Sequence, residues 1–230
     1  MKKLILFIAV CFCVSSVFAQ SAAQLKNEGN AALKSKDYKT AIEKYEAFLG
    51  AEDTVEDIAL VFNTGYCASK IKDYAKAEKY FAQSVANNYK PSKSYQYLAM
   101  MQKKQKKTDE MVATLKKGIE ACPTKNSKLL ASLAKHFFSV GQKAQKANKF
   151  ESAEASYKQA AELKSKYQET AMLALAQLYY NKGAEYWPAT QDKAKSYFEK
   201  ATVAAKNLLA VNPAKKEATD LIATIKGLVK

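Results

Sequence analysis

Residues 25–49 hold two amphipathic helical patterns separated by a short polar break, and this arrangement constrains the fold more than any other feature of the chain. Gly29 and Ala32 lie on the apolar side of the first pattern, and Ala41 and Tyr45 lie on that of the second. The small residues let two helices approach closely, while the tyrosine fills the space beside the contact. The stretch therefore predicts a helical hairpin.

One hairpin leaves an apolar face uncovered, so the unit should recur along the chain. A set of one small residue, one Ala-like residue and one large apolar residue does recur. Its members are Gly29, Ala41 and Tyr45; Gly65, Ala77 and Phe81; Ala99, Met111 and Leu115; Gly141, Ala153 and Tyr157; and Gly183, Ala194 and Phe198. The first members are 36, 34, 42 and 42 residues apart. Five hairpins exceed the minimum of about three for a stacked core.

This pattern resembles the tetratricopeptide repeat (TPR), which has a small residue in its first helix and Ala-x-x-x-aromatic-x-x-Ala in its second. The resemblance covers residues 22–213. It implies an all-α fold, a right-handed α-α solenoid of about five TPR-like helical hairpins plus a C-terminal capping helix. The expected units are about residues 22–53, 55–90, 92–125, 127–166 and 168–212, with the capping helix at 213–230.

The two steps of 42 residues exceed the family's usual step of about 34. We therefore expect longer helices or longer connections in the fourth and fifth units. In the fifth unit, the second helix should start at Thr190 or Gln191. In the capping helix, the apolar face should consist of Leu221, Ile222, Ile225 and Leu228.

Residues 1–19 have the pattern of a secretory signal peptide. Lys2 and Lys3 precede an apolar run over 4–14, and small residues end the segment at Ala19. The run is short for a helix that crosses a bilayer. We expect cleavage near Ala19 and an exported protein in the periplasm or at the exterior of a bacterium, one that does not span the membrane.

Few residues could support catalysis or metal binding. Cys67 and Cys122 remain after removal of the signal, and we expect two buried thiols, with a disulfide as the alternative. The single His136 has no partner in a metal-ligand spacing, so no metal site and no cofactor are predicted. Because the chain also lacks the common catalytic motifs, we expect that it is not an enzyme.

The positive charge comes entirely from lysine. The formal net charge is +15, or +13 without Lys2 and Lys3, and the chain has no arginine. Lysine attracts polyanions but lacks the planar fork that reads bases and phosphates at two points, so specific nucleic-acid binding is not expected. The lysines either solvate the helix faces or attract the chain to acidic partners or an anionic envelope surface.

One TPR subclass, the co-chaperone modules, holds the terminal carboxylates of a peptide with side chains from the first helices. The residues here that match this candidate carboxylate clamp are Lys26, Asn30, Asn63 and Lys93, and Tyr97 stands where the subclass has an arginine. The resemblance implies an acidic or C-terminal peptide as ligand, with ammonium groups offsetting its charge and amides donating hydrogen bonds. The alternative is that these residues serve packing and solvation.

Aromatic residues also align with groove-facing positions of the family. Phe62 and Tyr66 are expected on the peptide-binding surface, whereas Phe138 and Tyr179 are expected to be buried between helices. The sequence as a whole predicts a non-enzymatic scaffold that binds another protein or an extended peptide outside the cytoplasm, through its concave groove. The alternative is a lysine-rich, envelope-associated protein that binds polyanions.

Overall fold

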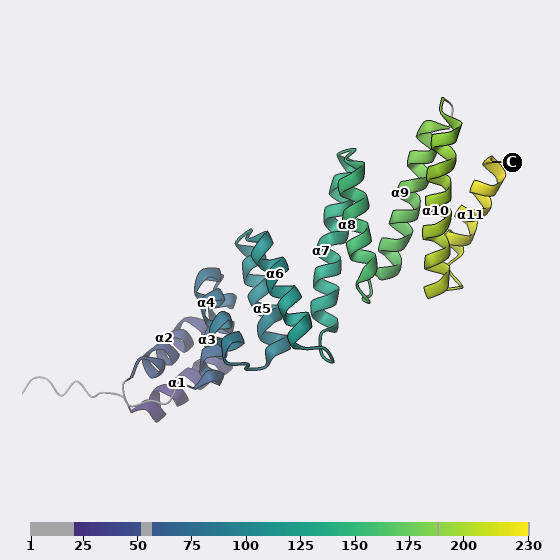
Figure 1. The fold of residues 1–230 in the computed structure, drawn as a ribbon. Coiled ribbons are helices and arrows are strands. Elements are labelled where there is room, and N and C mark those ends of the chain that lie inside the picture. Colours follow the sequence, from purple (N-terminus) through teal and green to yellow (C-terminus); the bar gives the residue numbers. More distant parts are fainter. Residues whose placement is uncertain (1–20, 52–56, 188, 230) are drawn as a thin grey trace, which may run out of the picture. The chain divides into compact units, whose positions relative to one another are not determined.

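The computed structural model describes residues 21–51, 57–187 and 189–229. Over these ranges the chain forms eleven α-helices and no strand (Figure 1). Within each of the two compact units described below, helices adjacent in the sequence pack against each other, which confirms the predicted all-α fold of paired helices. The chain divides into two compact units, one containing α1 to α4 and the other containing most of α5 and all of α6 to α11.

The first unit consists of two helical hairpins. Its helices are α1 (Ala22–Lys34), α2 (Tyr38–Leu49), α3 (Ile58–Lys70) and α4 (Tyr74–Ala86). Each helix starts at a side chain that accepts a hydrogen bond from a free backbone N–H of the first turn, and these caps are Ser21, Asp37, Asp57 and Asp73. α2 also packs against α3, so α3 is covered by α2 and α4.

The second unit continues the pairing. Its helices are α5 (Pro91–Lys104), α6 (Thr108–Ala121), α7 (Ser127–Lys146), α8 (Phe150–Glu162), α9 (Gln168–Tyr186), α10 (Gln191–Val211) and α11 (Lys216–Leu228). α7, α9 and α10 have 20, 19 and 21 residues, so of the two predicted alternatives, longer helices or longer connections, the structure has longer helices. α10 starts at Gln191 after the cap residue Thr190, as predicted.

The repeated glycines lie against the repeated aromatic rings. A methyl group added at Gly29 would lie 2.6 Å from ring carbons of Tyr45, and one added at Gly141 would lie 2.6 Å from ring carbons of Tyr157. Both rings are almost fully buried. The close approach of the two helices predicted from the small residues is therefore confirmed in these hairpins.

In the third hairpin the two helices exchange these roles. Ala99 occupies the glycine position of the first helix, and Leu115 occupies the aromatic position of the second. The glycine is instead Gly118 of α6, where an added methyl group would lie 2.7 Å from the Cβ and Cγ of Tyr95 in α5. In this hairpin the aromatic ring therefore lies on the first helix, and the glycine that accommodates it lies on the second.

In the first four hairpins the turn between the two helices ends with a residue in the left-handed conformation. Lys36 and Lys72 have φ angles of 64° and 65°, and Asn148 has a φ of 55°. Around Lys36, its own N–H bonds to the Leu33 carbonyl, and the next N–H bonds back to the Ala32 carbonyl. This is the Schellman arrangement, in which glycine is the usual left-handed residue.

The last helix packs on α10 through part of its expected face. Ile225 is buried, and Leu221 and Ile222 are half-buried against the core formed with α9 and α10. Leu228 is 38% exposed, because α11 ends at this residue. The buried part of the expected apolar face therefore ends at Ile225.

Both cysteines are free and buried, as expected. Burial raises the pKa of the Cys67 thiol to about 11, which keeps it protonated at neutral pH. None of the described helices has the length and apolar character needed to cross a bilayer. The predicted signal peptide and its cleavage position lie outside the described residues.

Candidate functional site

Lys26, the first residue of the candidate carboxylate clamp, is paired with a carboxylate of the chain itself. Its Nζ lies 2.8 Å from Oδ2 of Asp57. Asp57 also caps α3 by accepting hydrogen bonds from the backbone N–H groups of Ala59 and Leu60. Burial raises the pKa of Asp57, but hydrogen bonds from Lys26 and Leu60 outweigh it and hold the pKa below its usual value. A peptide carboxylate would have to compete with Asp57 for Lys26.

Asn30 of α1 and Asn63 of α3 meet at one buried hydroxyl. The Tyr45 hydroxyl donates a hydrogen bond of 2.9 Å to Oδ1 of Asn30, and the Asn63 side chain donates one to the same phenol oxygen. Burial raises the pKa of Tyr45 to about 12. The structure therefore brings these two candidate residues together, and their shared partner is a core side chain.

Phe62 lies in the core of the first unit and not on its surface. Only 5% of it is exposed, and its ring packs against Phe81 and Tyr89 at centroid distances of 5.4 and 5.8 Å. The expectation that Phe62 faces a ligand is corrected, because α2 and α4 cover α3 on both sides. Tyr66 is half-buried, with its ring edge-on to Tyr38 at 6.3 Å.

The remaining clamp residues belong to the second unit. Lys93 is exposed and Tyr97 is half-buried, one turn apart on α5. The candidate clamp is thus divided between the two units. Tyr179 is buried, as predicted, and Phe138 is partly buried, with its ring 5.7 Å from that of Tyr157.

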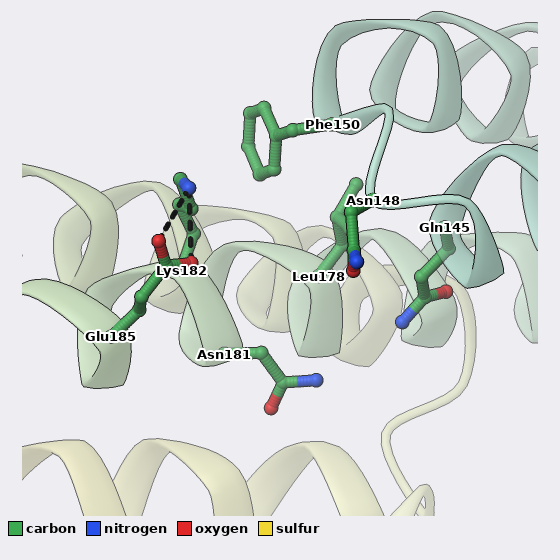
Figure 2. Close-up of a pocket in the computed structure, with 7 residues that line it drawn as sticks. All are labelled: Gln145, Asn148, Phe150, Leu178, Asn181, Lys182 and Glu185. Carbon is green, nitrogen blue, oxygen red and sulfur yellow. Dashed lines mark hydrogen bonds and ion pairs between the residues drawn. The ribbon is translucent and has the colours of Figure 1, made fainter.

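A pocket that the sequence analysis missed lies between α7 and α9, the first helices of the fourth and fifth hairpins. Its volume is about 680 Å³. The lining residues come from α9 and from the end of α7 and its turn into α8, and they are Gln145, Asn148, Phe150, Leu178, Asn181, Lys182 and Glu185. Figure 2 shows the amide groups of Gln145, Asn148 and Asn181 around one open space.

A second pocket of about 380 Å³ adjoins the first and shares Gln145 with it. Its other lining residues are Phe138, Gln142, Lys146, Tyr157, Thr170, Leu173, Ala174 and Gln177. We call the two pockets together the α7–α9 groove. Apolar side chains contribute to both pockets, and five amide side chains line the groove: Gln142, Gln145, Asn148, Gln177 and Asn181.

The groove carries little net charge although the chain carries +15. The Lys182 ammonium lies 2.9 Å from both carboxylate oxygens of Glu185, and this hydrogen bond raises the pKa of Lys182. Lys146 is the other charged residue of the lining. Neutral amides that both donate and accept hydrogen bonds suit the N–H and C=O groups of a polypeptide better than they suit a polyanion.

Gln145 is oriented by the core. The Tyr157 hydroxyl donates a hydrogen bond of 2.7 Å to Oε1 of Gln145. The oxygen is therefore held by the protein, and the amide nitrogen is the group that Gln145 can offer to a ligand. Because Tyr157 also contacts Gly141, the packing of the hairpin fixes the position of this amide.

The sequence contained one signal for this groove. Gln142 and Gln145 are three residues apart, and Gln177 and Asn181 are four apart, so each pair lies on one helix face. The resemblance to the co-chaperone modules directed the prediction to the first three units instead. Within the described part of the chain, no group of His, Cys, Asp and Glu side chains is arranged to hold a metal ion.

Comparison with known proteins found a strong structural match. No known family model matches the sequence. The crystal structure of a TPR repeats protein from Bacteroides fragilis shares 31% sequence identity and a TM-score of 0.83, and the match covers 91% of this chain and 99% of that one. A structure of MamA from AMB-1 shares 21% identity with a TM-score of 0.45, covering 86% of this chain and 96% of that one.

Proposed function

The chain belongs to the tetratricopeptide repeat family, and on this premise we propose that it is a non-enzymatic scaffold that binds an extended segment of another protein in the α7–α9 groove. The observation that carries the proposal is the set of five neutral amides, four on the neighbouring first helices α7 and α9 and one, Asn148, in the turn that follows α7. Such amides can pair with the backbone of an extended segment, whose own N–H and C=O groups have no internal partners.

The dimensions of the groove suit a short segment. Its lining on α9 runs from Thr170 to Glu185, a rise of about 22 Å. An extended chain of about six or seven residues covers that length. Small or apolar side chains of the segment would contact Phe138, Ala174 and Leu178 between the amides.

The direct test is selection from a random peptide library displayed on phage, followed by affinity measurement on the mature chain. We expect the selected peptides to have low net charge and to lose at least about tenfold in affinity with Gln145→Ala plus Asn181→Ala. The matched control is Gln83→Ala plus Gln191→Ala, which removes two exposed amides outside the groove. Equal affinity for the two double variants would reject the groove as the site.

Salt dependence separates the proposal from polyanion binding by the lysine surface. Peptide affinity should change less than about threefold between about 0.05 and about 0.5 M salt, since neutral hydrogen bonds dominate. Dextran sulfate serves as the polyanion probe, and its binding should fall steeply over the same range. If the selected peptides are acidic and released by salt, the lysine surface becomes the better assignment.

The candidate carboxylate clamp remains a second proposal, supported by the meeting of Asn30 and Asn63 at Tyr45. A peptide carboxylate would displace Asp57 from Lys26. Selected peptides with a free C-terminus should then bind better than their amidated forms, and Lys26→Ala should abolish that preference. Equal binding of the free and the amidated peptides would reject the carboxylate clamp.

We also propose that the chain is exported and acts outside the cytoplasm. The proposal rests on the signal-like pattern of residues 1–19 and its cleavage motif near Ala19. A mature chain that starts at Gln20 in the envelope or external fraction would support it. A full-length chain that stays in the cytoplasm would refute it.

A further inference from the structure

A separate groove lies on the opposite face of α9, between α8 and α10. Its volume is about 650 Å³, and we call it the α8–α10 groove. The α9 residues in its lining are Met172, Leu175 and Tyr179. At about 100° per residue these lie on the side of α9 opposite to Ala174, Gln177 and Asn181 of the first groove. The two grooves can therefore be occupied independently.

The lining of this groove has the shape of a trough between two helices. One face of α8 and one face of α10 form its sides, and α9 forms its floor. The residues are Glu154, Lys158, Ala161 and Glu162 on α8, and Ser196, Glu199, Lys200, Val203, Ala204 and Asn207 on α10. The stripe on α10 rises about 16 Å, which equals about three helical turns.

The trough presents apolar surface to solvent. Val203 is 57% exposed, the largest value among the exposed large hydrophobic side chains of the described residues. Met172 and Leu175 are half-buried beneath it, and Ala161 and Ala204 leave space at the sides. An exposed apolar patch in a concave position is typical of an interaction site.

The charged residues of the trough fall into two groups. Lys158 lies 2.6 Å from Glu154, whose Oε1 also accepts a 2.7 Å hydrogen bond from the Tyr179 hydroxyl. Glu154 and Lys158 are therefore paired within the protein. Lys200 is exposed and lies over the Tyr197 ring at 5.0 Å, a contact that leaves its positive charge in place.

The carboxylates of Glu162 and Glu199 are exposed, one on each side of the trough. Neither of them forms an ion pair with another residue in the described part of the chain. With Glu154 and Lys158 paired, two carboxylates stand against the one ammonium group of Lys200, so the balance of the lining is negative and favours a partner with positive flanks.

We propose that the α8–α10 groove binds an amphipathic helix of a partner protein, one whose apolar face is flanked by lysine or arginine. A helix satisfies its own backbone hydrogen bonds, so it needs no set of amides such as the first groove supplies. Its apolar stripe would cover Val203, Met172 and Leu175. Its basic flanks would meet Glu162 and Glu199.

Methionine methyl NMR on the mature chain tests the proposal directly. Of the five methionines, Met1 precedes the expected cleavage position, and Met172 alone among the others lines this groove. The probe is a synthetic helical peptide with leucine on one face and lysine on both flanks. We expect it to shift the Met172 signal and to leave that of Met100, a methionine 39% exposed on α5, unchanged.

Three comparisons make the test specific. Val203→Lys should weaken binding about tenfold, whereas Val211→Lys, at a valine 48% exposed on the same helix, should have little effect. A peptide of the same design with glutamate flanks should bind the wild type poorly. It should bind better than the lysine peptide once Glu162 and Glu199 are both changed to lysine.

The outcomes that overturn the proposal are distinct. An unshifted Met172 signal at millimolar peptide rejects the groove as a helix site. Equal weakening by Val203→Lys and Val211→Lys places the contact elsewhere. Equal binding of the lysine and glutamate peptides rejects the basic partner. None of these results bears on the amides of the α7–α9 groove, so the two proposals can fail separately.

Discussion

A contact between a glycine and an aromatic ring sets the separation of the helices within a hairpin. It occurs between Gly29 and Tyr45, and again between Gly141 and Tyr157. Each ring occupies the position where the other helix lacks a Cβ, and close-packed interiors leave no room for a further carbon. Both partners recur at helical spacing, so this contact could be predicted from the sequence.

We expect Gly29→Ala and Gly141→Ala each to lower the free energy of unfolding by about 2 kcal/mol, because the new methyl group would overlap the ring and force the helices apart. The measurement is urea unfolding at neutral pH. Gly227→Ala is the matched control in α11, where a new methyl group meets nothing within 4 Å. It should be neutral or slightly stabilising, and a loss as large as that of Gly29→Ala would contradict the role of the ring contact.

At the scale of the helices, tyrosine hydroxyls join neighbouring elements. Tyr45 of α2 bonds to Asn30 of α1, and Tyr179 of α9 bonds to Glu154 of α8. Burial raises the pKa of both tyrosines to about 12, and for Tyr179 the hydrogen bond to Glu154 adds to the effect. Both hydroxyls are therefore more strongly protonated in the folded chain than in the unfolded one.

The raised pKa values predict a loss of stability at high pH. The two protonated hydroxyls contribute fully to the free energy of unfolding below the unfolded-state pKa of about 10. This contribution disappears as the pH rises through the folded-state pKa of about 12. The Tyr45→Phe, Tyr179→Phe double variant should be less stable than wild type at about pH 8, since two hydrogen bonds are lost. Urea unfolding at a series of pH values should show this difference shrinking toward pH 12. If the difference in stability between wild type and variant stayed constant with pH, the raised tyrosine pKa values would not contribute to stability.

The sequence allowed the helices and their pairing to be predicted better than the candidate site. Helix starts have local signals, such as Asp37 before Tyr38 and Asp73 before Tyr74. Whether an aromatic side chain faces a ligand or the core depends on elements distant in the sequence. Phe62 was expected on the surface, but its ring packs on Phe81 and Tyr89.

The α7–α9 groove could not be predicted because its shape arises only when two long helices stand side by side. The amides at Gln145 and Asn181 are 36 residues apart and belong to different hairpins. Glutamine and asparagine are also common on any solvated helix face, so their spacing alone does not identify a site. The pocket, and the Tyr157 hydroxyl that orients Gln145, distinguish them in the structure.

At the scale of the whole molecule, the chain consists of two compact units, and most residue contacts fall within one unit or the other. Trp187, the single tryptophan, lies in the second unit against Phe198, at a centroid distance of 5.7 Å. Its fluorescence therefore reports on the second unit, whereas far-ultraviolet circular dichroism reports on the helices of both.

We expect the two units to unfold in separable steps, as arrays of repeats often do. Gly29→Ala should shift part of the dichroism transition in urea and leave the Trp187 transition in place. Gly141→Ala should shift the Trp187 transition. If both variants move both signals equally, the chain unfolds as one cooperative block.

The left-handed turns make limited proteolysis a local probe of hairpin opening. Lys36 and Lys72 occupy turn positions where many helical hairpins carry glycine. The chain has no arginine, so trypsin cuts it only after lysine, and each of these two turns has two such bonds, after Lys34 and Lys36 and after Lys70 and Lys72. The paired hydrogen bonds around each turn keep the backbone from extending into a protease cleft. Cleavage at each turn therefore measures how often that particular hairpin opens.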